Sequence, residues 1–415
     1  MTDFAVLGLS DQLVGQLSAM GLTKPTPIQT QAIPALLEGR DVMGLAQTGT
    51  GKTAAFGLPL VQYLYANPMR NKDKAVRVLI LTPTRELANQ VTENIKGYAA
   101  DGYLRIRTVV GGVSINPQCR RLERGADILV ATPGRLIDLL ERKAVRVDRA
   151  THLVLDEADQ MLDMGFITPL RQIAKHLSSE RQTVLFSATM PKQMATLAAE
   201  FLNDPLRIEV APAGKVADRI EQSVHYVEQN AKMTLLKDLL AEHEGEHAVV
   251  FARTKHGAER MAKQLVAAGF PADAIHGNKN QNQRERALRG FREGKTRVLV
   301  ATDVAARGID IPAVRYVYNF DLPNVAENYI HRIGRTARAG AAGRAIAFCA
   351  PTEIEDLVGI EKLLPEALPV ASGTRWPFVK APKQKRGGGG NRRGPQGAKP
   401  GANRARRPRR PRKAA

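Results

Sequence analysis

The stretch Ala46-Gln47-Thr48-Gly49-Thr50-Gly51-Lys52-Thr53 decides the fold expected for the first half of this chain of 415 residues. It follows the short apolar run Val42-Met43-Gly44-Leu45, and the order indicates a strand, a glycine-rich loop and the start of a helix. Such a loop points backbone N–H groups at an anion, and the helix dipole favours the same charge. Lys52 can reach the β- and γ-phosphates of a nucleotide, and the Thr53 hydroxyl can bind Mg²⁺. The alternative is a plain glycine turn, and Ala46 stands where the usual pattern has its first glycine.

The overall composition is that of a soluble globular protein with one unusual feature, its charge. The hydrophobic fraction of 43% and the charged fraction of 25% are ordinary, and the length suggests about two or three domains. The formal net charge is +20, but the segment 371–415 alone contains fifteen Lys and Arg residues and no Asp or Glu. The positive charge therefore belongs mostly to the end of the chain.

The cysteines and the N-terminus indicate a compartment. Cys119 and Cys349 are too few for a disulfide framework or a metal knuckle, which fits a reducing environment. Met1-Thr2-Asp3-Phe4 lacks the basic and apolar regions of a signal peptide, and no apolar run is long enough to span a bilayer. We therefore expect a cytoplasmic protein with no membrane partner.

Short apolar runs recur through the first half of the chain, at 78–81, 128–130, 153–155 and 184–186. Helix-length amphipathic sequence separates them, the pattern of a parallel sheet that is buried on both faces. A polar cluster follows each run directly, at 82–86, 131–135, 156–159 and 187–189. Because ligands bind outside the carboxyl ends of such strands, we expect these clusters to converge beside the phosphate loop.

The acidic cluster at 156–159 supplies carboxylates, which the phosphate loop lacks. Asp156 ends a strand, a position from which a carboxylate can hold Mg²⁺ together with Thr53. Glu157 is placed to orient or polarise an attacking water. The alternative is an acidic helix start that faces solvent. The presence of Lys52 in a phosphate loop upstream favours the metal role over this alternative. A carboxamide can pair with the N6 and N7 edge of adenine, so Gln29, upstream of the loop, is a candidate base reader.

Loop-like sequence from Asp204 to Arg219 separates these runs from a second set. The second set again alternates with helix-length sequence, and its runs lie at 224–227, 248–252, 298–301, 314–318 and 345–349. It indicates a second α/β domain without a phosphate loop of its own. The expected organisation is domain 1 at 1–208, a linker at 209–219, domain 2 at 220–370 and a tail at 371–415.

Two polar stretches of the second half, 301–310 and 331–338, point back to the nucleotide. At helical spacing His331, Arg335 and Arg338 share one face. A face with two guanidinium groups needs an anionic partner, and a γ-phosphate held by the first domain is a natural one. The alternative is a solvent-exposed basic helix.

With these motifs in order, the chain resembles the DEAD-box family of ATP-dependent RNA helicases over about Phe4 to Leu364. The matching stretches are 25–29, 46–53, 83–88, Gly111-Gly112, 132–135, Asp156-Glu157-Ala158-Asp159, 187–189, 301–310 and 331–338. Within the family the chain is most similar to the bacterial RhlE branch, on the strength of 111–117, 252–257 and 276–279.

The resemblance implies two tandem RecA-like domains with parallel sheets, a flexible linker, ATP with Mg²⁺ between the domains, and RNA across both. The residues that would bind ATP are Gln29, Ala46, Gln47, Thr48, Gly49, Thr50, Gly51, Lys52, Thr53 and Asp310. The catalytic residues would be Lys52, Asp156, Glu157, Arg335 and Arg338, with Mg²⁺ held by Thr53 and Asp156, partly through water. Ser187 and Thr189 would couple the state of ATP to domain closure through Asp159 and His331. The RNA backbone would be contacted by Thr84, Arg85, Gly112, Thr132, Arg135, Arg253 and Thr302.

Two positions depart from the family pattern. Leu22 follows Gly21, where many members carry an aromatic side chain beside the adenine, and this puts adenine stacking in question but not the Gln29 contact. Ala337 stands where glycine is common, and we expect a helix at this position to tolerate it.

The predicted function is ATP hydrolysis coupled to local separation of short RNA duplexes or to remodelling of RNA–protein complexes. Contacts to the RNA backbone carry little sequence information, so binding by the two domains is expected to be nonspecific. One alternative is an ATP-gated RNA clamp or scaffold in which hydrolysis serves only release. Another is an enzyme that acts on DNA or on a small substrate.

The basic tail at 371–415 has too few apolar residues to fold, so we expect it to be disordered. It either attaches RNA electrostatically, with a strong dependence on salt, or serves solubility or binding to ribosomal or RNA-decay partners.

Overall fold

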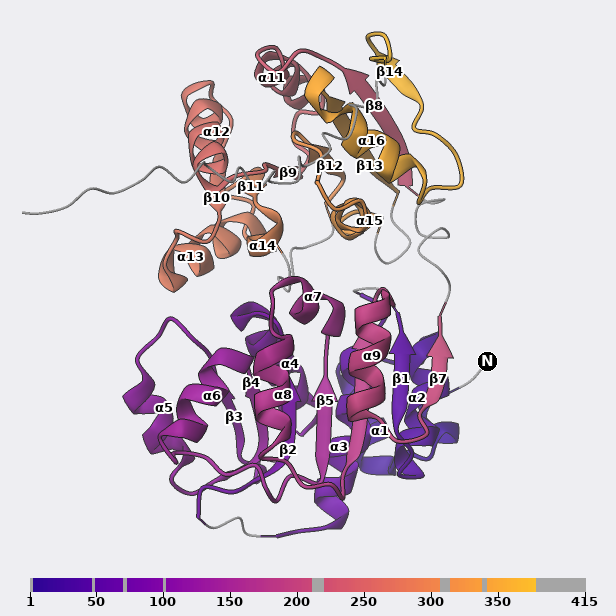
Figure 1. Cartoon of the computed structure of the whole chain (residues 1–415), viewed down its shortest axis with the longest axis vertical. Coiled ribbons are helices and arrows are strands. Elements are labelled where there is room, and N and C mark those ends of the chain that lie inside the picture. The colour runs from indigo at the N-terminus through magenta and orange to yellow at the C-terminus, as the bar shows by residue number, and fades with distance from the viewer. Residues whose placement is uncertain are drawn as a thin grey trace, which may run out of the picture. The chain divides into compact units, whose positions relative to one another are not determined.

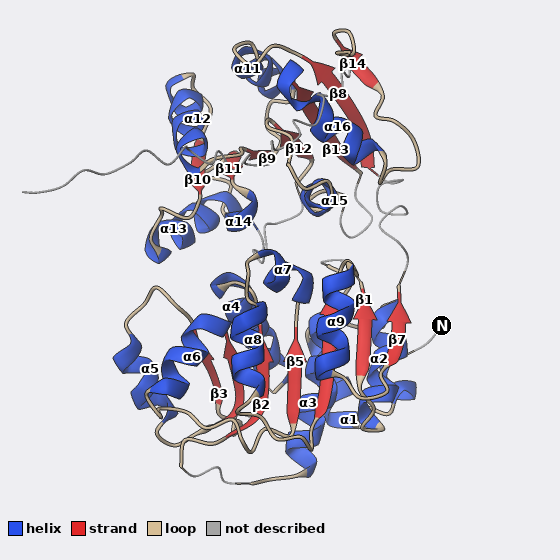
Figure 2. Ribbon diagram, in the orientation of Figure 1, coloured by secondary structure: helices blue, strands red, loops and turns tan. Residues whose placement is uncertain are grey.

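The computed structural model describes residues 3–46, 49–69, 73–99, 102–210, 220–306, 314–337 and 342–377. These residues build two seven-stranded sheets, each covered by helices on both faces (Figures 1 and 2). We call 3–210 the first domain and 220–377 the second domain. In the described part of the chain, no helix is both long enough and apolar enough to cross a membrane.

The first sheet has the strand order β3-β4-β2-β5-β6-β1-β7, and every pairing in it is parallel. Its strands are β1 (Val42–Leu45), β2 (Val76–Leu81), β3 (Ile106–Val109), β4 (Ala126–Ala131), β5 (His152–Leu155), β6 (Gln182–Ser187) and β7 (Leu206–Glu209). Parallel pairing brings all the carboxyl ends to one edge. The end of β1, from which the phosphate loop leaves, therefore lies beside the end of β6 and close to that of β5.

Alternation along the strands divides the core of the first domain into two layers. Val78 and Ile80 face one helix layer, whereas Leu79 and Leu81 face the other, because successive side chains of a strand point to opposite faces. The helices of the first layer are α1 (Asp11–Ala19), α2 (Pro27–Leu37), α3 (Lys52–Ala66) and α4 (Arg85–Tyr98). Those of the second layer are α5 (Ile115–Leu122), α6 (Pro133–Glu141), α7 (Ala158–Asp163), α8 (Ile167–Ala174) and α9 (Lys192–Phe201).

The second sheet repeats this design in the order β10-β11-β9-β12-β13-β8-β14, again entirely parallel. Its strands are β8 (Ile220–Tyr226), β9 (Ala248–Phe251), β10 (Ala272–Ile275), β11 (Val298–Ala301), β12 (Tyr316–Asn319), β13 (Gly343–Cys349) and β14 (Val370–Ser372). One face packs on α11 (Lys232–Glu242) and α12 (Lys255–Ala267). The other packs on α13 (Gln281–Arg292), α14 (Asp303–Ala306), α15 (Glu327–Ile333) and α16 (Ile354–Glu361).

The predicted fold of two α/β domains with parallel sheets is confirmed, and two predicted boundaries differ from the strands of the structure. The predicted linker at 209–219 begins inside β7, which ends at Glu209. The predicted start of the tail at Ala371 falls inside β14, and the compact part of the chain continues to Pro377. The indole of Trp376 donates a hydrogen bond to the Cys349 carbonyl at 2.9 Å, which fixes this extension to the end of β13. The tail from 378 to 415 and linker residues 211–219 lie outside the described residues.

Candidate functional site

The phosphate loop runs from the end of β1 into α3. Gly49 and Gly51 have φ angles of 86° and 91°, in the left-handed region that glycine adopts without penalty. Lys52 is the first residue of α3, and its Nζ donates to the Ala46 carbonyl at 3.0 Å. The buried ammonium group therefore lies over the loop, with Thr53 in the same first turn of the helix.

Gln29, the predicted base reader, is bound to the phosphate loop. Its Nε2 donates to the Gly51 carbonyl at 3.0 Å, and its Oε1 accepts from the Thr26 amide at 2.8 Å. Thr26 also donates from Oγ1 to the Thr50 carbonyl at 2.8 Å. The start of α2 and the loop are thus joined by two side chains. Leu22, the departure noted above, is exposed.

Asp156 lies directly after β5 with 2% of its surface exposed. Its Oδ1 has no hydrogen-bond partner among the described residues. Burial raises the pKa of Asp156 to about 7, while nearby Lys52 lowers it. A buried carboxylate oxygen without a donor is satisfied by a divalent cation, so the carboxylate and the Thr53 hydroxyl fit Mg²⁺.

Mg²⁺ does not require a cage made only of protein. Within the described ranges, no group of three or more His, Cys, Asp or Glu side chains could hold a metal ion. Mg²⁺ commonly keeps several waters and binds substrate phosphates through one or two protein ligands. Asp156 and Thr53 would be such ligands.

Glu157 occupies a strained position between Asp156 and α7. Its φ is 53°, a left-handed conformation that costs a non-glycine residue about 1–3 kcal/mol. The residue is 3% exposed and serves as the N-cap of α7. Strain of this kind concentrates at functional sites, and here it turns the chain sharply after β5.

Asp159 joins the acidic cluster to the turn that follows β6. Its Oδ2 accepts hydrogen bonds from the amides of Ala188 and Thr189, each at 3.0 Å, and from the Thr189 hydroxyl at 3.2 Å. Ser187 Oγ donates to the Thr189 carbonyl at 2.6 Å. His331 Nε2 lies 3.9 Å from the same Oδ2 atom. The four residues predicted to couple the two motifs are therefore brought together.

The predicted helix carrying His331, Arg335 and Arg338 on one face is wrong. Helix α15 ends at Ile333 with Gly334 as its C-cap, and Arg335 follows it, 2% exposed. Thr336 then forms a bridge with Val314. Ala337 has a φ of 53°, so the expected tolerance of alanine in a helix does not apply. The position requires the conformation that glycine adopts most easily.

Arg332 is a buried member of the same stretch to which sequence reasoning assigned no role. Its Nε and Nη2 pair with the two oxygens of Asp303 at 2.6 and 2.8 Å. The guanidinium also lies 4.9 Å from the centre of the Phe251 ring. Since Asp303 directly follows Thr302, a predicted RNA contact, Arg332 ties α15 to the end of β11. The position of Arg332 between His331 and Arg335 could have drawn attention to it. Sequence spacing alone, however, does not reveal that Asp303 is its partner.

The RNA candidates of the first domain gather at the ends of β2, β3 and β4. Thr84 and Thr132 are the N-caps of α4 and α6. The guanidinium of Arg85 lies against Gly112, where a Cβ atom would come within 2.0 Å of Nη1. Arg135 Nη2 donates at 3.0 Å to the carbonyl of Val113, the residue that follows Gly112. Two guanidinium groups and two helix N-termini thus line one edge, an arrangement that suits phosphates.

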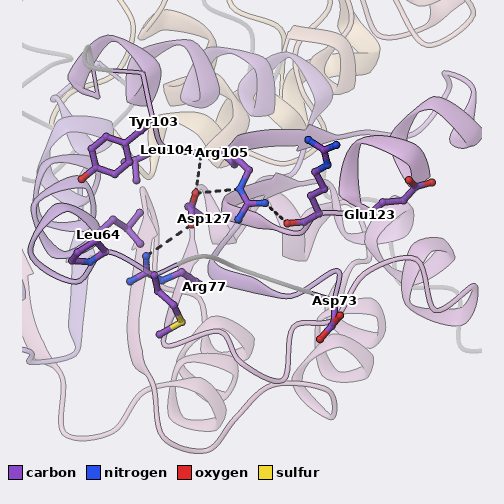
Figure 3. A pocket seen from close by; sticks show the side chains of 11 residues that line it. Leu64, Asp73, Arg77, Tyr103, Leu104, Arg105, Glu123 and Asp127 are labelled. Carbon is purple, nitrogen blue, oxygen red and sulfur yellow. Dashed lines mark hydrogen bonds and ion pairs between the residues drawn. The ribbon is translucent and has the colours of Figure 1, made fainter.

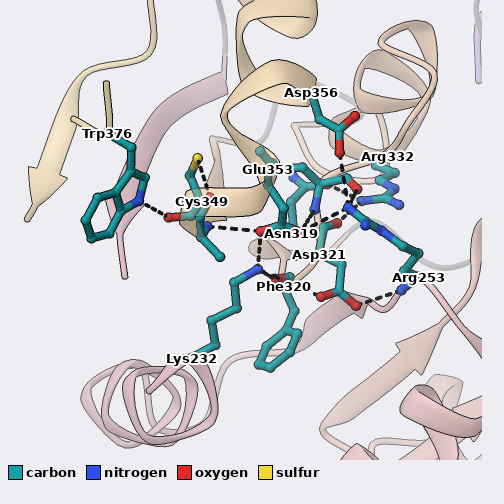
Figure 4. Close-up of polar contacts among 12 residues, drawn as sticks. Lys232, Arg253, Asn319, Phe320, Asp321, Arg332, Cys349, Glu353, Asp356 and Trp376 are labelled. Carbon is teal, nitrogen blue, oxygen red and sulfur yellow. Dashed lines mark hydrogen bonds and ion pairs between the residues drawn. The ribbon is translucent and has the colours of Figure 1, made fainter. Parts of the chain in front are cut away.

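The RNA candidates of the second domain follow neighbouring strands. Arg253 comes after β9 and Thr302 after β11, and these strands pair directly. Thr302 is 8% exposed. The Arg253 side chain is 42% exposed and contacts the carboxylates of Glu353 and Asp356 (Figure 4). Sequence reasoning missed these two acidic partners, which lie about a hundred residues away along the chain.

A cavity of about 920 Å³ lies away from these residues. It is lined by Arg77 of β2 and Asp127 of β4, whose side chains are 3.9 Å apart (Figure 3). Both residues stand at the amino ends of their strands. The cavity is therefore on the opposite edge of the sheet and is separate from the nucleotide candidates. Four predicted site residues, Gln47, Thr48, Asp310 and Arg338, lie outside the described residues.

Comparison with known proteins gives a consistent result. The family model DEAD/DEAH box helicase matches residues 26–197, and the model helicase conserved C-terminal domain matches residues 231–340. The RNA helicase CrhR of Synechocystis sp. is 46% identical over 370 residues, which cover 89% of this chain and 74% of that protein. The ATP-dependent RNA helicase CshA of Listeria monocytogenes is 43% identical over 376 residues, or 91% and 71% of the two chains. The structure of S. cerevisiae Dbp5 bound to RNA and ADP BeF3 matches with a TM-score of 0.79 and 32% identity, covering 90% of this chain and 96% of that one.

Proposed function

This chain belongs to the DEAD-box family of ATP-dependent RNA helicases, and we propose that it couples ATP hydrolysis to local separation of short RNA duplexes or to remodelling of RNA–protein complexes. Its two domains are RecA-like, and its reaction uses ATP with Mg²⁺. One contact supports the coupling above all others: Asp159, beside the magnesium candidate Asp156, holds the Ser187–Thr189 turn.

In the proposed nucleotide site, the residues of the phosphate loop bind the phosphates and Gln29 reads the adenine. Thr53 and Asp156 would hold Mg²⁺, which would neutralise charge on the phosphates when bound. Glu157 accepts a hydrogen bond from the attacking water and draws its proton as the oxygen bonds to the γ-phosphorus. The bond from that phosphorus to the bridging oxygen breaks, and ADP leaves with the electron pair.

Arg335 and Arg338 serve as arginine fingers in this proposal. Groups of this kind raise hydrolysis by about a thousandfold or more, so turnover depends on bringing the second domain to the phosphates. If RNA spans both domains, RNA and ATP favour the same closed state, and each raises the affinity for the other. Coupling runs through Ser187, Thr189, Asp159 and His331.

We propose that RNA contacts the carboxyl edges of both sheets. Thr84, Arg85, Gly112, Thr132 and Arg135 would bind its backbone in the first domain, and Arg253 and Thr302 in the second. The support in the first domain is that the guanidinium groups of Arg85 and Arg135 lie at the same sheet edge as the N-termini of α4 and α6. Guanidinium groups and helix N-termini both bind phosphate oxygens.

The experiment that tests the function measures ATPase rate and duplex separation with RNA and DNA of one sequence. We expect stimulation by RNA and ATP-dependent separation of a short duplex. Glu157→Gln should trap ATP and RNA together, and Arg335→Ala should abolish turnover with nucleotide binding retained. ATP-dependent clamping without strand separation, equal stimulation by DNA, or near-normal turnover of Arg335→Ala would contradict the proposal.

Three finer assignments belong to the same proposal. Similarity at 111–117, 252–257 and 276–279 supports the RhlE branch. The free cysteines Cys119 and Cys349 fit a reducing, cytoplasmic location. The basic residues beyond Pro377 would bind RNA, ribosomal or RNA-decay partners. Deleting 378–415 should then weaken RNA binding at low salt more than at high salt, because counterion release drives such binding.

A further inference from the structure

A network of buried charges lies at the carboxyl edge of the second sheet, centred on Glu353 (Figure 4). Glu353 is 2% exposed. Its Oε1 accepts from Arg253 Nη2 and from the Leu322 amide, each at 3.1 Å. Its Oε2 accepts from Lys232 Nζ and from the Ala350 amide. Four donors therefore occupy the acceptor sites of this carboxylate and fix its orientation.

The same network contacts both the side chain and the backbone amide of Arg253. Asp356 Oδ2, the Leu322 carbonyl and Glu353 Oε1 each lie 3.1 Å from Nη2, so its two N–H groups are shared among three acceptors. The Arg253 amide donates to Asp321 Oδ2 at 2.8 Å. All side-chain hydrogen bonds that Arg253 makes to the described residues use Nη2, and 42% of the side chain remains exposed. The Nε and Nη1 donors stay available on a guanidinium that is anchored at Nη2.

We infer that Glu353 and Asp356 are positioning residues that hold the Arg253 guanidinium ready for an RNA phosphate. The inference rests on the proposed RNA contact of Arg253. A planar guanidinium binds phosphate oxygens with fixed geometry, and a long side chain held in advance loses less conformational freedom on binding. Glu353 and Asp356 would therefore strengthen RNA binding through geometry.

Charge alone predicts the opposite effect of these carboxylates. A carboxylate near a phosphate repels it, so its removal should tighten RNA binding if geometry plays no part. The sign of the change in RNA affinity therefore separates the two explanations. Asp356 is the better residue to test, because its side chain is 22% exposed whereas that of Glu353 is 3% exposed and bound to buried Lys232.

The experiment measures the RNA concentration that half-saturates ATPase activity in the full-length protein. We expect Asp356→Ala to raise this concentration roughly fivefold, the effect of one lost hydrogen bond, with kcat at saturating RNA unchanged. Asp356→Glu should restore part of the affinity. Glu355→Ala removes the same charge from an exposed neighbour on α16 and should leave the half-saturating concentration unchanged or slightly lower.

A double-mutant cycle with Arg253→Ala completes the test. Once Arg253 is removed, Asp356→Ala should have no further effect on RNA affinity. Three outcomes would overturn the inference: equal effects of Asp356→Ala with and without Arg253, tighter RNA binding by Asp356→Ala, or a lower thermal midpoint of Asp356→Ala without a change in RNA affinity. Normal RNA binding by Arg253→Ala would also overturn it, but the helicase function would stand.

The function itself would be refuted by a different result, namely that RNA does not stimulate the ATPase activity of the wild-type protein.

Discussion

The carboxylate of Asp159 holds Thr189 at two points, accepting from its amide at 3.0 Å and from its hydroxyl at 3.2 Å. The same oxygen accepts from the Ala188 amide. One buried charge therefore fixes the turn after β6 to the helix that begins beside β5. The two turns cannot shift independently without breaking charge-assisted hydrogen bonds.

Asp159→Asn should uncouple duplex separation from nucleotide binding. The amide keeps only one acceptor oxygen, and its nitrogen cannot accept from a backbone N–H. The variant therefore loses either the hydrogen bonds to the turn or the one from the Gln160 amide, and it loses the negative charge that strengthens both. We expect strand separation to slow about tenfold or more, in line with the loss of hydrogen bonds to a charged group, with the ATP dissociation constant little changed. Asp163→Asn, at the exposed end of the same helix, is the control. Wild-type strand separation by Asp159→Asn would contradict the coupling role.

Lys232→Met should destabilise the second domain strongly. Lys232 is fully buried, and its Nζ donates to Glu353 and, at 2.7 Å, to the Phe320 carbonyl. Removing one partner of a buried ion pair costs about 3–5 kcal/mol, because the other charge remains buried. Urea unfolding of the variant measures the loss, with Lys237→Met on the same helix as the comparison. A loss below about 1 kcal/mol would mean that the pair is less desolvated than its burial indicates.

Ala337→Gly should stabilise the protein. The φ of 53° at Ala337 disfavours any residue with a Cβ atom, by about 1–2 kcal/mol. Glycine removes this strain but adds conformational freedom to the unfolded chain, worth about 0.4–1 kcal/mol. We expect a net gain of about 1 kcal/mol and a higher thermal midpoint. Ala337→Val should lower the midpoint, and the reverse order of the two variants would refute the strain.

Stability at acidic pH should depend on His152. Burial, and secondarily Arg77, lowers the pKa of His152 from 6.5 to about 4. Between these values the unfolded chain binds a proton that the folded chain does not, so stability is complete above pH 6.5 and falls as the pH decreases toward 4. The loss at pH 4 is about 3 kcal/mol.

Unfolding midpoints of His152→Phe and wild type across this pH range check the effect. The variant should lose less stability on acidification, since it has no imidazole to protonate. His176→Phe, an exposed position, should keep the pH dependence of the wild type. Parallel curves for His152→Phe and wild type would show that other groups cause the acid sensitivity.

The central strands were predictable because their residues are apolar throughout. The run 128–130 lies within β4 and the run 298–301 is β11, both buried along their whole length. Strands β3, β7, β10 and β14 escaped prediction, and in β3 and β10 the reason is that Arg107, Thr108 and Asp273 interrupt the apolar pattern. All four strands occupy sheet edges, where one side needs no strand partner.

The polar site was predictable in outline but not in its connections. Motif order placed Lys52 after one strand and Asp156 and Asp159 after another, at the same edge of the sheet, since parallel strands fix where their carboxyl ends lie. The network of Lys232 and Glu353 joins residues 121 positions apart, and no local pattern signals such a pair. The prediction of one helical face for His331, Arg335 and Arg338 was wrong because it extended helical spacing through Gly334, where the helix ends.

The contact between Gln29 and Gly51 limits the sequences that this chain can explore. A Cβ atom at position 51 would lie 2.4 Å from Gln29 Nε2, so alanine would displace the glutamine side chain, and the φ of 91° would strain its backbone. A shorter side chain at position 29 would make room but would lose the hydrogen bond to the loop. The hydrogen bond therefore makes the geometry of the loop depend on a side chain 22 residues earlier in the chain. A substitution at Gln29 that removes the Nε2 donor should loosen the loop even when position 51 keeps its glycine.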